Sequence, residues 1–136
     1  FSALTLISAT QNFTQLTLLN ATTVGALLTY TYFNIKPARF MMGDVGSLGL
    51  GALLAVNALA IGELTTLFFL GFMFYIEALS VIIQVSSRYI LGHKIFAMAP
   101  IHHHFEIRGW SEEKTVMRFW VIHFIFVVFG LWLALH

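Results

Sequence analysis

The chain has 136 residues, of which 59% are hydrophobic and only 10% are charged. A soluble globular domain carries about 25% charged residues, and a water-soluble fold of this size cannot hide so much apolar surface in one core. The composition therefore excludes soluble classes and indicates an integral membrane protein. A net charge of +1 gives no support to nucleic-acid binding, and the absence of Cys excludes disulfides, thiolate metal sites and Cys nucleophiles.

Charge-free apolar stretches predict a single transmembrane domain, an all-α, polytopic bundle of about four membrane helices. The expected spans are residues 13–33, 46–61, 64–85 and 116–135. Loops 34–45 and 86–115, with the first turn of the last helix, hold all seven Lys and Arg residues. By the positive-inside rule, both loops are expected to face the cytoplasm.

A single aspartate, Asp44, stands at the cytoplasmic start of the second predicted span, within the run Met-Gly-Asp-Val-Gly-Ser at 42–47. One interpretation is a capping carboxylate favoured by the helix dipole. The other is a hard oxygen ligand for Mg²⁺, which proteins hold with one or two carboxylates plus substrate phosphates. The small residues that follow fit close helix packing, or the approach of a phosphate to the helix N-terminus.

Three adjacent histidines, His102, His103 and His104, lie in the second predicted loop. Neighbouring side chains on a regular helix point about 100° apart, so the three cannot all face one metal from a helix. They also lack the i, i+4 spacing of a zinc helix. A loop could present two of them to phosphates, and an exposed polar loop is the alternative.

Two polar residues, Glu77 and Gln84, interrupt the third predicted span. A carboxyl group midway along a membrane helix is costly unless it is neutral, paired or facing a polar cavity. Gln84 lies two turns further along the same face. We interpret both residues as lining a bundle-interior stripe that leads to the loop, with a simple interhelical hydrogen bond as the alternative for Glu77.

These features together predict a phosphate site. A carboxylate, a glycine-rich helix start, histidines and clustered Lys and Arg share the predicted cytoplasmic side, and phosphoryl transfer needs mainly positioning and charge neutralisation. The membrane setting favours a lipid as one reactant. The residues alone therefore predict a cytoplasm-facing, Mg²⁺-dependent phosphate site on a membrane bundle.

Several of these runs resemble the phospho-N-acetylmuramoyl-pentapeptide transferase family of bacteria, the MraY family. The similar segments are Phe33–Leu48, Ile76–Val85, Ile95–Glu106, Gly109-Trp110 and Arg118-Phe119-Trp120. Related polyprenyl-phosphate sugar-phosphate transferases share the Gly-Asp element, but three histidines after Met-Ala-Pro favour this family among them. The similarity runs in order from residue 33 to the C-terminal residue.

The resemblance implies transfer of phospho-MurNAc-pentapeptide from UDP to undecaprenyl phosphate in peptidoglycan synthesis, which gives lipid I and UMP and requires Mg²⁺. It implies a multi-pass protein of the bacterial inner (plasma) membrane. It also implies that Asp44 is the Mg²⁺-linked catalytic carboxylate and that the three histidines lie at the catalytic site in individual roles left open. The implied substrate-binding residues are Asn34, Phe40, Gly43, Gln84 and Ala99.

The chain departs from the family pattern in two ways. Met41 precedes Met-Gly-Asp where the family has a Phe that can stack on uracil, and Phe40 lies one position earlier. The family has about ten membrane spans and further aspartates in its first half, whereas this chain has one Asp. We therefore expect the chain to be the C-terminal part of such an enzyme and to be inactive without the missing N-terminal half. A homodimer is compatible with this expectation.

Two other functions stay open at this point. One is a sibling transferase that uses another UDP-sugar. The other is a non-enzymatic membrane module, including a metal-binding protein that uses the histidine loop.

Overall fold

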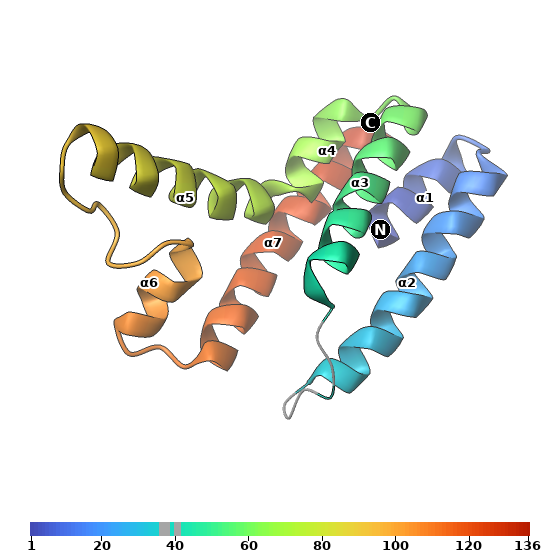
Figure 1. Ribbon diagram of the computed structural model, residues 1–136. Coiled ribbons are helices and arrows are strands. Elements are labelled where there is room, and N and C mark those ends of the chain that lie inside the picture. The colour runs from blue at the N-terminus through green and yellow to red at the C-terminus, as the bar shows by residue number, and fades with distance from the viewer. Residues whose placement is uncertain (36–38, 40–41) are drawn as a thin grey trace. The chain divides into compact units, whose positions relative to one another are not determined.

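The computed structural model describes residues 1–35, 39 and 42–136. Within these residues all regular secondary structure is helical, which confirms the all-α prediction (Figure 1). The helices are α1 (Ser2–Thr10), α2 (Thr14–Asn34), α3 (Gly43–Ile61), α4 (Leu64–Leu70), α5 (Phe72–Ile90), α6 (Ile101–Ile107) and α7 (Glu112–Leu135). Phe40, one of the predicted substrate-binding residues, lies outside the described part.

Long apolar helices give the chain its membrane character. In the described residues, α3 and α7 are long and apolar enough to cross a membrane, and α4 with α5 forms a third candidate, bent by 71°. The expected third span, 64–85, falls on this bent pair, which separates at Gly71. Glycine weakens a helix by about 1 kcal/mol relative to Ala, so a break is least costly there. The chain is thus a polytopic helical membrane fragment.

Most large apolar side chains of these helices are exposed, including Val45 and Leu48 on α3 and Phe124 on α7. In water such a surface would cause aggregation. Lipid is as apolar as these side chains, so membrane helices keep them on the outside and place small and polar residues between helices.

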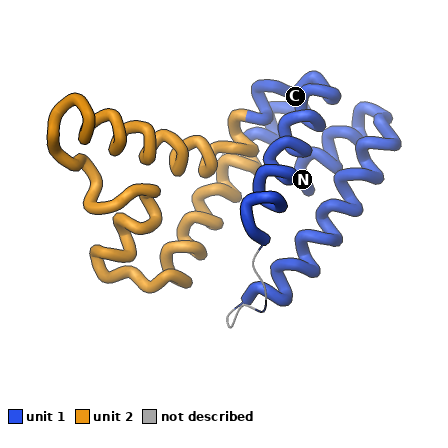
Figure 2. Tube along the Cα trace, viewed as in Figure 1, with its two compact units in different colours: residues 1–67, 130–136 blue, residues 68–129 orange. Residues whose placement is uncertain are grey.

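Contacts divide the chain into two compact units (Figure 2). Unit 1 comprises residues 1–67 and 130–136, and unit 2 comprises residues 68–129. Each unit is described by itself below.

In unit 1, α1 packs against α2 and α3 through a small apolar core of Ala3, Leu4 and Ile7. Buried polar groups join the same helices. The Asn20 side-chain amide donates to Asn57 Oδ1 at 3.5 Å, and both residues are at most 1% exposed. Pairing of this kind is expected, because a buried amide without a partner costs free energy.

Helix α3 ends in a left-handed residue, Gly62, with φ of 82°. The backbone N–H of Gly62 donates to Leu59 O at 3.1 Å, and the N–H of Glu63 donates to Ala58 O at 3.0 Å. This is the Schellman pattern, which satisfies the last carbonyls of a helix and stops it. Gly62 therefore fixes where α3 ends.

In unit 2, aromatic side chains hold the helices together. Phe72 of α5 stacks on Phe126 of α7 with ring centroids 3.5 Å apart. Phe105 of α6 stacks on Trp110 at 4.8 Å and meets the edge of Phe119 of α7 at 5.9 Å. These contacts attach both α5 and α6 to α7, so the three helices surround a common space.

Candidate functional site

One face of α5 carries four polar residues at spacings of three and four, so they lie in a row along the helix. They are Glu77, Ser80, Gln84 and Ser87. Each bonds to the segment that follows α5, in reverse order along the chain. The bonds are Ser87 Oγ to His93 O (2.9 Å), Gln84 to the Phe96 backbone, Ile101 N–H to Ser80 Oγ (3.0 Å) and His102 Nδ1 with Glu77 Oε2 (3.0 Å).

These bonds hold the connection 91–100 and the start of α6 against α5, with the chain running back along the helix. Gln84 contributes two bonds: its Nε2 donates to Phe96 O at 2.8 Å, and its Oε1 accepts from Phe96 N–H at 2.9 Å. The carboxamide of Gln84, expected to bind substrate, thus holds the loop backbone. Ala99, a second expected substrate residue, lies in the loop that Gln84 holds, directly before Pro100 at the start of α6.

The three histidines lie on the short helix α6, rather than in an irregular loop, and their side chains take different partners. His102 Nδ1 lies 3.0 Å from Glu77 Oε2, and His103 Nδ1 lies 2.7 Å from Glu106 Oε2. His104 Nδ1 instead accepts the backbone N–H of Ala97 at 3.0 Å. Helical geometry explains the divergence, because successive side chains turn by about 100°.

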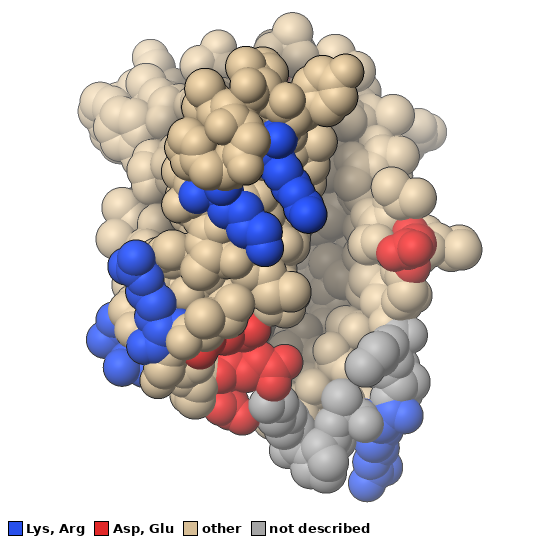
Figure 3. Space-filling model, turned by 60° about the vertical axis from the view of Figure 1, so that its left-hand side comes forward, with Lys and Arg blue, Asp and Glu red and all other residues tan. Residues whose placement is uncertain are grey.

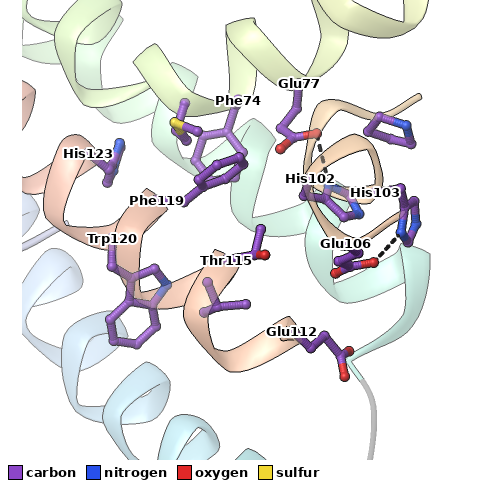
Figure 4. A pocket seen from close by; sticks show the side chains of 13 residues that line it. Phe74, Glu77, His102, His103, Glu106, Glu112, Thr115, Phe119, Trp120 and His123 are labelled. Carbon is purple, nitrogen blue, oxygen red and sulfur yellow. Dashed lines mark hydrogen bonds and ion pairs between the residues drawn. The ribbon is translucent and has the colours of Figure 1, made fainter. Parts of the chain in front are cut away.

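A pocket of about 530 Å³ lies among α5, α6 and α7 of unit 2 (Figure 4). Its polar side holds Glu77, His102, His103 and Glu106, and its apolar side includes Phe119. Further lining residues are Met73, Phe74, Pro100, Glu112, Thr115, Val116, Trp120 and His123. A mostly apolar cavity of this size with a few converging polar groups is the usual form of a small-molecule site.

The basic side chains of unit 2 lie at its surface; the Lys and Arg of the chain are drawn in blue in Figure 3. All are exposed: Arg88, Lys94, Arg108, Lys114 and Arg118. Arg118 and Lys114 approach the ring of Trp110, at 4.2 and 5.2 Å from its centroid. An indole ring attracts cations at such distances, so Trp110 helps to hold these two charges near the start of α7.

The remaining predicted site residues belong to unit 1. Gly43 opens α3 with φ of 65°, and Asp44 follows it, exposed in the first turn. The Met42 N–H donates to the Tyr30 hydroxyl at 3.2 Å, which ties the start of α3 to α2. Asn34 ends α2, and its buried Oδ1 has no hydrogen-bond partner among the described residues.

The structure therefore brings the predicted residues together in two groups. Asn34, Gly43 and Asp44 are in unit 1, and Gln84, Ala99 and the three histidines are in unit 2. That Asp44 and the histidines share one surface stays a prediction. Within the described ranges, no three His, Asp or Glu side chains are placed to hold one metal ion.

The sequence reasoning missed three residues of this site: Ser80, Ser87 and Glu106. The two serines share the helical spacing of Glu77 and Gln84, so extending that row would have found them. Glu106 lies three residues after His103, a spacing that brings side chains together on a helix.

Comparison with known proteins agrees with the sequence motifs. Residues 1–62 match the family model of glycosyl transferase family 4. A curated phospho-N-acetylmuramoyl-pentapeptide-transferase from Staphylococcus carnosus (strain TM300) is 45% identical over 113 residues, which is 83% of this chain and 35% of that protein. The chain thus spans about a third of the length of this relative. Residues 1–62 are thus similar to glycosyl transferase family 4, and 83% of the chain is similar to a phospho-N-acetylmuramoyl-pentapeptide transferase.

Proposed function

We propose that this chain forms part of the active site of a transferase that moves phospho-MurNAc-pentapeptide from UDP to undecaprenyl phosphate, giving lipid I and UMP. One observation carries the proposal: over 83% of its length, the chain is 45% identical to a curated phospho-N-acetylmuramoyl-pentapeptide-transferase. The pocket of unit 2 supports it, because its histidines are held in fixed orientations beside an apolar wall.

The reaction is a displacement at phosphorus. An oxygen of the lipid phosphate forms a bond to the phosphorus next to the sugar, the bond from that phosphorus to the UMP oxygen breaks, and UMP leaves with the electron pair. The net balance is the same for direct transfer and for a covalent enzyme intermediate. Such reactions need mainly positioned groups and neutralised charge, and His102 and His103 are positioned in this way.

One residue of unit 1, Asp44, fits a Mg²⁺ site that substrate phosphates would complete. Asp44 presents an exposed carboxylate beside the start of α3, and one carboxylate together with substrate phosphates is a usual way to hold Mg²⁺. Asp44 would hold the ion, which when bound neutralises the diphosphate. The backbone N–H groups at the start of α3 add partial positive charge near Asp44, and this charge favours the phosphate groups of the substrate.

We also propose where the chain works. Its polar loops face the cytoplasm of a bacterial inner membrane, and it needs the rest of the enzyme, including an N-terminal half that supplies further carboxylates. The chain alone is expected to be inactive. Two observations support this proposal: the chain covers 35% of the relative, and it has a single aspartate.

A chimaera tests the proposal. The matching segment of the Staphylococcus carnosus protein is replaced by this chain, and UMP release is measured in membranes with UDP-MurNAc-pentapeptide and undecaprenyl phosphate. We expect Mg²⁺-dependent release from the chimaera and none from the chain alone. Release only with another UDP-sugar would identify a sibling transferase. A chimaera that is folded, binds Zn²⁺ through its histidines and releases no UMP would instead favour the metal-binding module.

A further inference from the structure

The three histidines of α6 differ in the chemistry of the atom that faces Nδ1. For His102 and His103 that atom is a carboxylate oxygen, at 3.0 and 2.7 Å. For His104 it is the backbone nitrogen of Ala97, at 3.0 Å. An ionised carboxylate only accepts hydrogen bonds and a backbone N–H only donates. Nδ1 therefore carries a proton in His102 and His103 and carries a lone pair in His104.

The other ring nitrogen must then differ as well. A neutral imidazole has one N–H, and the hydrogen bond at one nitrogen decides which nitrogen carries it. In the neutral form of each ring, Nε2 is therefore a hydrogen-bond acceptor in His102 and His103, whereas in His104 it is a donor. Three identical side chains in succession thus provide two different chemical groups.

The pocket distinguishes the histidines in the same way. His102 and His103 line it together with their carboxylate partners, and His104 is not among its lining residues (Figure 4). The rings of His104 and Phe96 lie 5.9 Å apart, edge to face, so His104 packs against the loop. The hydrogen bond of His104 therefore holds the loop in place, while those of His102 and His103 orient two side chains that line the pocket.

The two carboxylate pairs also differ in origin. Glu106 and His103 lie on the same helix, three residues apart, so α6 forms this pair by itself. Glu77 reaches His102 from α5, beside the bond from Ile101 N–H to Ser80 Oγ. The side chains of Glu77 and His102 are 24% and 37% exposed, so water only partly surrounds the pair.

We propose that Glu77 is a positioning residue that keeps the proton of His102 on Nδ1, so that Nε2 presents a lone pair to the pocket. This inference rests on the proposed function for the identity of the substrate. A nitrogen lone pair cannot form a hydrogen bond with an oxygen of the diphosphate, because that oxygen carries no proton to donate. The lone pair can instead accept a hydrogen bond from a hydroxyl or N–H group of the sugar-peptide portion of the substrate.

The tautomers are measured directly by ¹⁵N NMR of the 136-residue chain in detergent micelles, with labelled histidine and assignment by single His→Asn variants. We expect the proton on Nδ1 in His102 and on Nε2 in His104. In Glu77→Gln, His102 becomes a mixture of tautomers while His103 and His104 are unchanged. Glu106→Gln is the matched control: it removes the same charge from the same pocket and changes only His103. A proton on Nε2 of His102 in the unaltered chain, or an unchanged His102 in Glu77→Gln, overturns the proposal.

Kinetics in the chimaera then test the substrate contact. The loss of one oriented hydrogen bond predicts that Glu77→Gln raises KM for UDP-MurNAc-pentapeptide about tenfold, with little change in KM for undecaprenyl phosphate. A rise only in KM for the lipid overturns the contact with the sugar-peptide portion. If the unaltered chimaera releases no UMP, the proposed function fails, and the NMR result still decides the role of Glu77.

Discussion

Units 1 and 2 use polar side chains in contrasting ways. In unit 1 the buried polar pair, Asn20 with Asn57, lies between helices, and the candidate carboxylate, Asp44, is exposed at a helix start. In unit 2 the polar row of α5 binds backbone groups of the following segment and the side chain of His102, and the bond from Glu77 orients that histidine. The comparison teaches that contacts within this chain hold the histidine side chains in place, whereas the role that we propose for Asp44 depends on substrate phosphates and a metal ion.

The largest expected effect is on UMP release, and it comes from replacing Asp44, the exposed carboxylate of unit 1. In the chimaera, Asp44→Asn should lower UMP release by at least about 100-fold, because the amide lacks the charge that we propose holds Mg²⁺ at the diphosphate. The thermal unfolding of the variant should match that of the unaltered protein, since the side chain is exposed. Turnover that survives the substitution would remove Asp44 from the mechanism.

The next largest effect concerns unit 2, where the polar row of α5 holds the loop that follows it. Gln84→Ala removes both bonds to the Phe96 backbone and leaves a partly buried N–H and C=O without them. We expect a loss of about 2 kcal/mol in the free energy of unfolding and faster amide hydrogen exchange near Phe96. Gln11→Ala is the matched control, because its exposed amide makes one long bond of 3.5 Å to Glu63. Equal losses in the two variants would contradict the special role of the α5 polar row.

A smaller effect is expected inside unit 1. Asn57→Ala leaves the Asn20 amide buried without its partner, which should cost about 1 kcal/mol in detergent unfolding titrations. Replacing both residues by Leu should cost less than the single change, because no buried polar group is then left unpaired. A double variant that is less stable than the single variant would show that the pair matters for packing rather than for hydrogen bonding.

The smallest effect separates two isosteres at His104. The Oδ1 of Asn can occupy the place of Nδ1 and accept the Ala97 N–H, whereas the longer Gln cannot. We expect His104→Gln to be less stable than His104→Asn by about 0.5 kcal/mol, as measured by chemical unfolding of the chain. The reverse order would show that the Nε2 position, and not the bond to Ala97, is the important feature.

Part of the site could be predicted from local spacing. Glu77 and Gln84 were placed on one helix face, and they are, because seven residues make two turns of a helix. The divergence of the three histidines also follows from helical geometry. The use of Gln84 to hold a loop could not be predicted, since its partner Phe96 lies twelve residues later and beyond a turn. The spacing gave no indication that the α4–α5 segment bends at Gly71.

The sequence by itself determined the class of this protein: an all-helical membrane fragment with a histidine run and one aspartate. Composition and hydropathy decide this because lipid burial is a sum over residues along each segment and needs no knowledge of distant partners. Only the tertiary structure decided which histidines line the pocket and which hydrogen-bonding role the Nδ1 of each one takes. Those properties depend on whether a carboxylate or a backbone N–H meets Nδ1, and for His102 that partner, Glu77, is supplied by another helix.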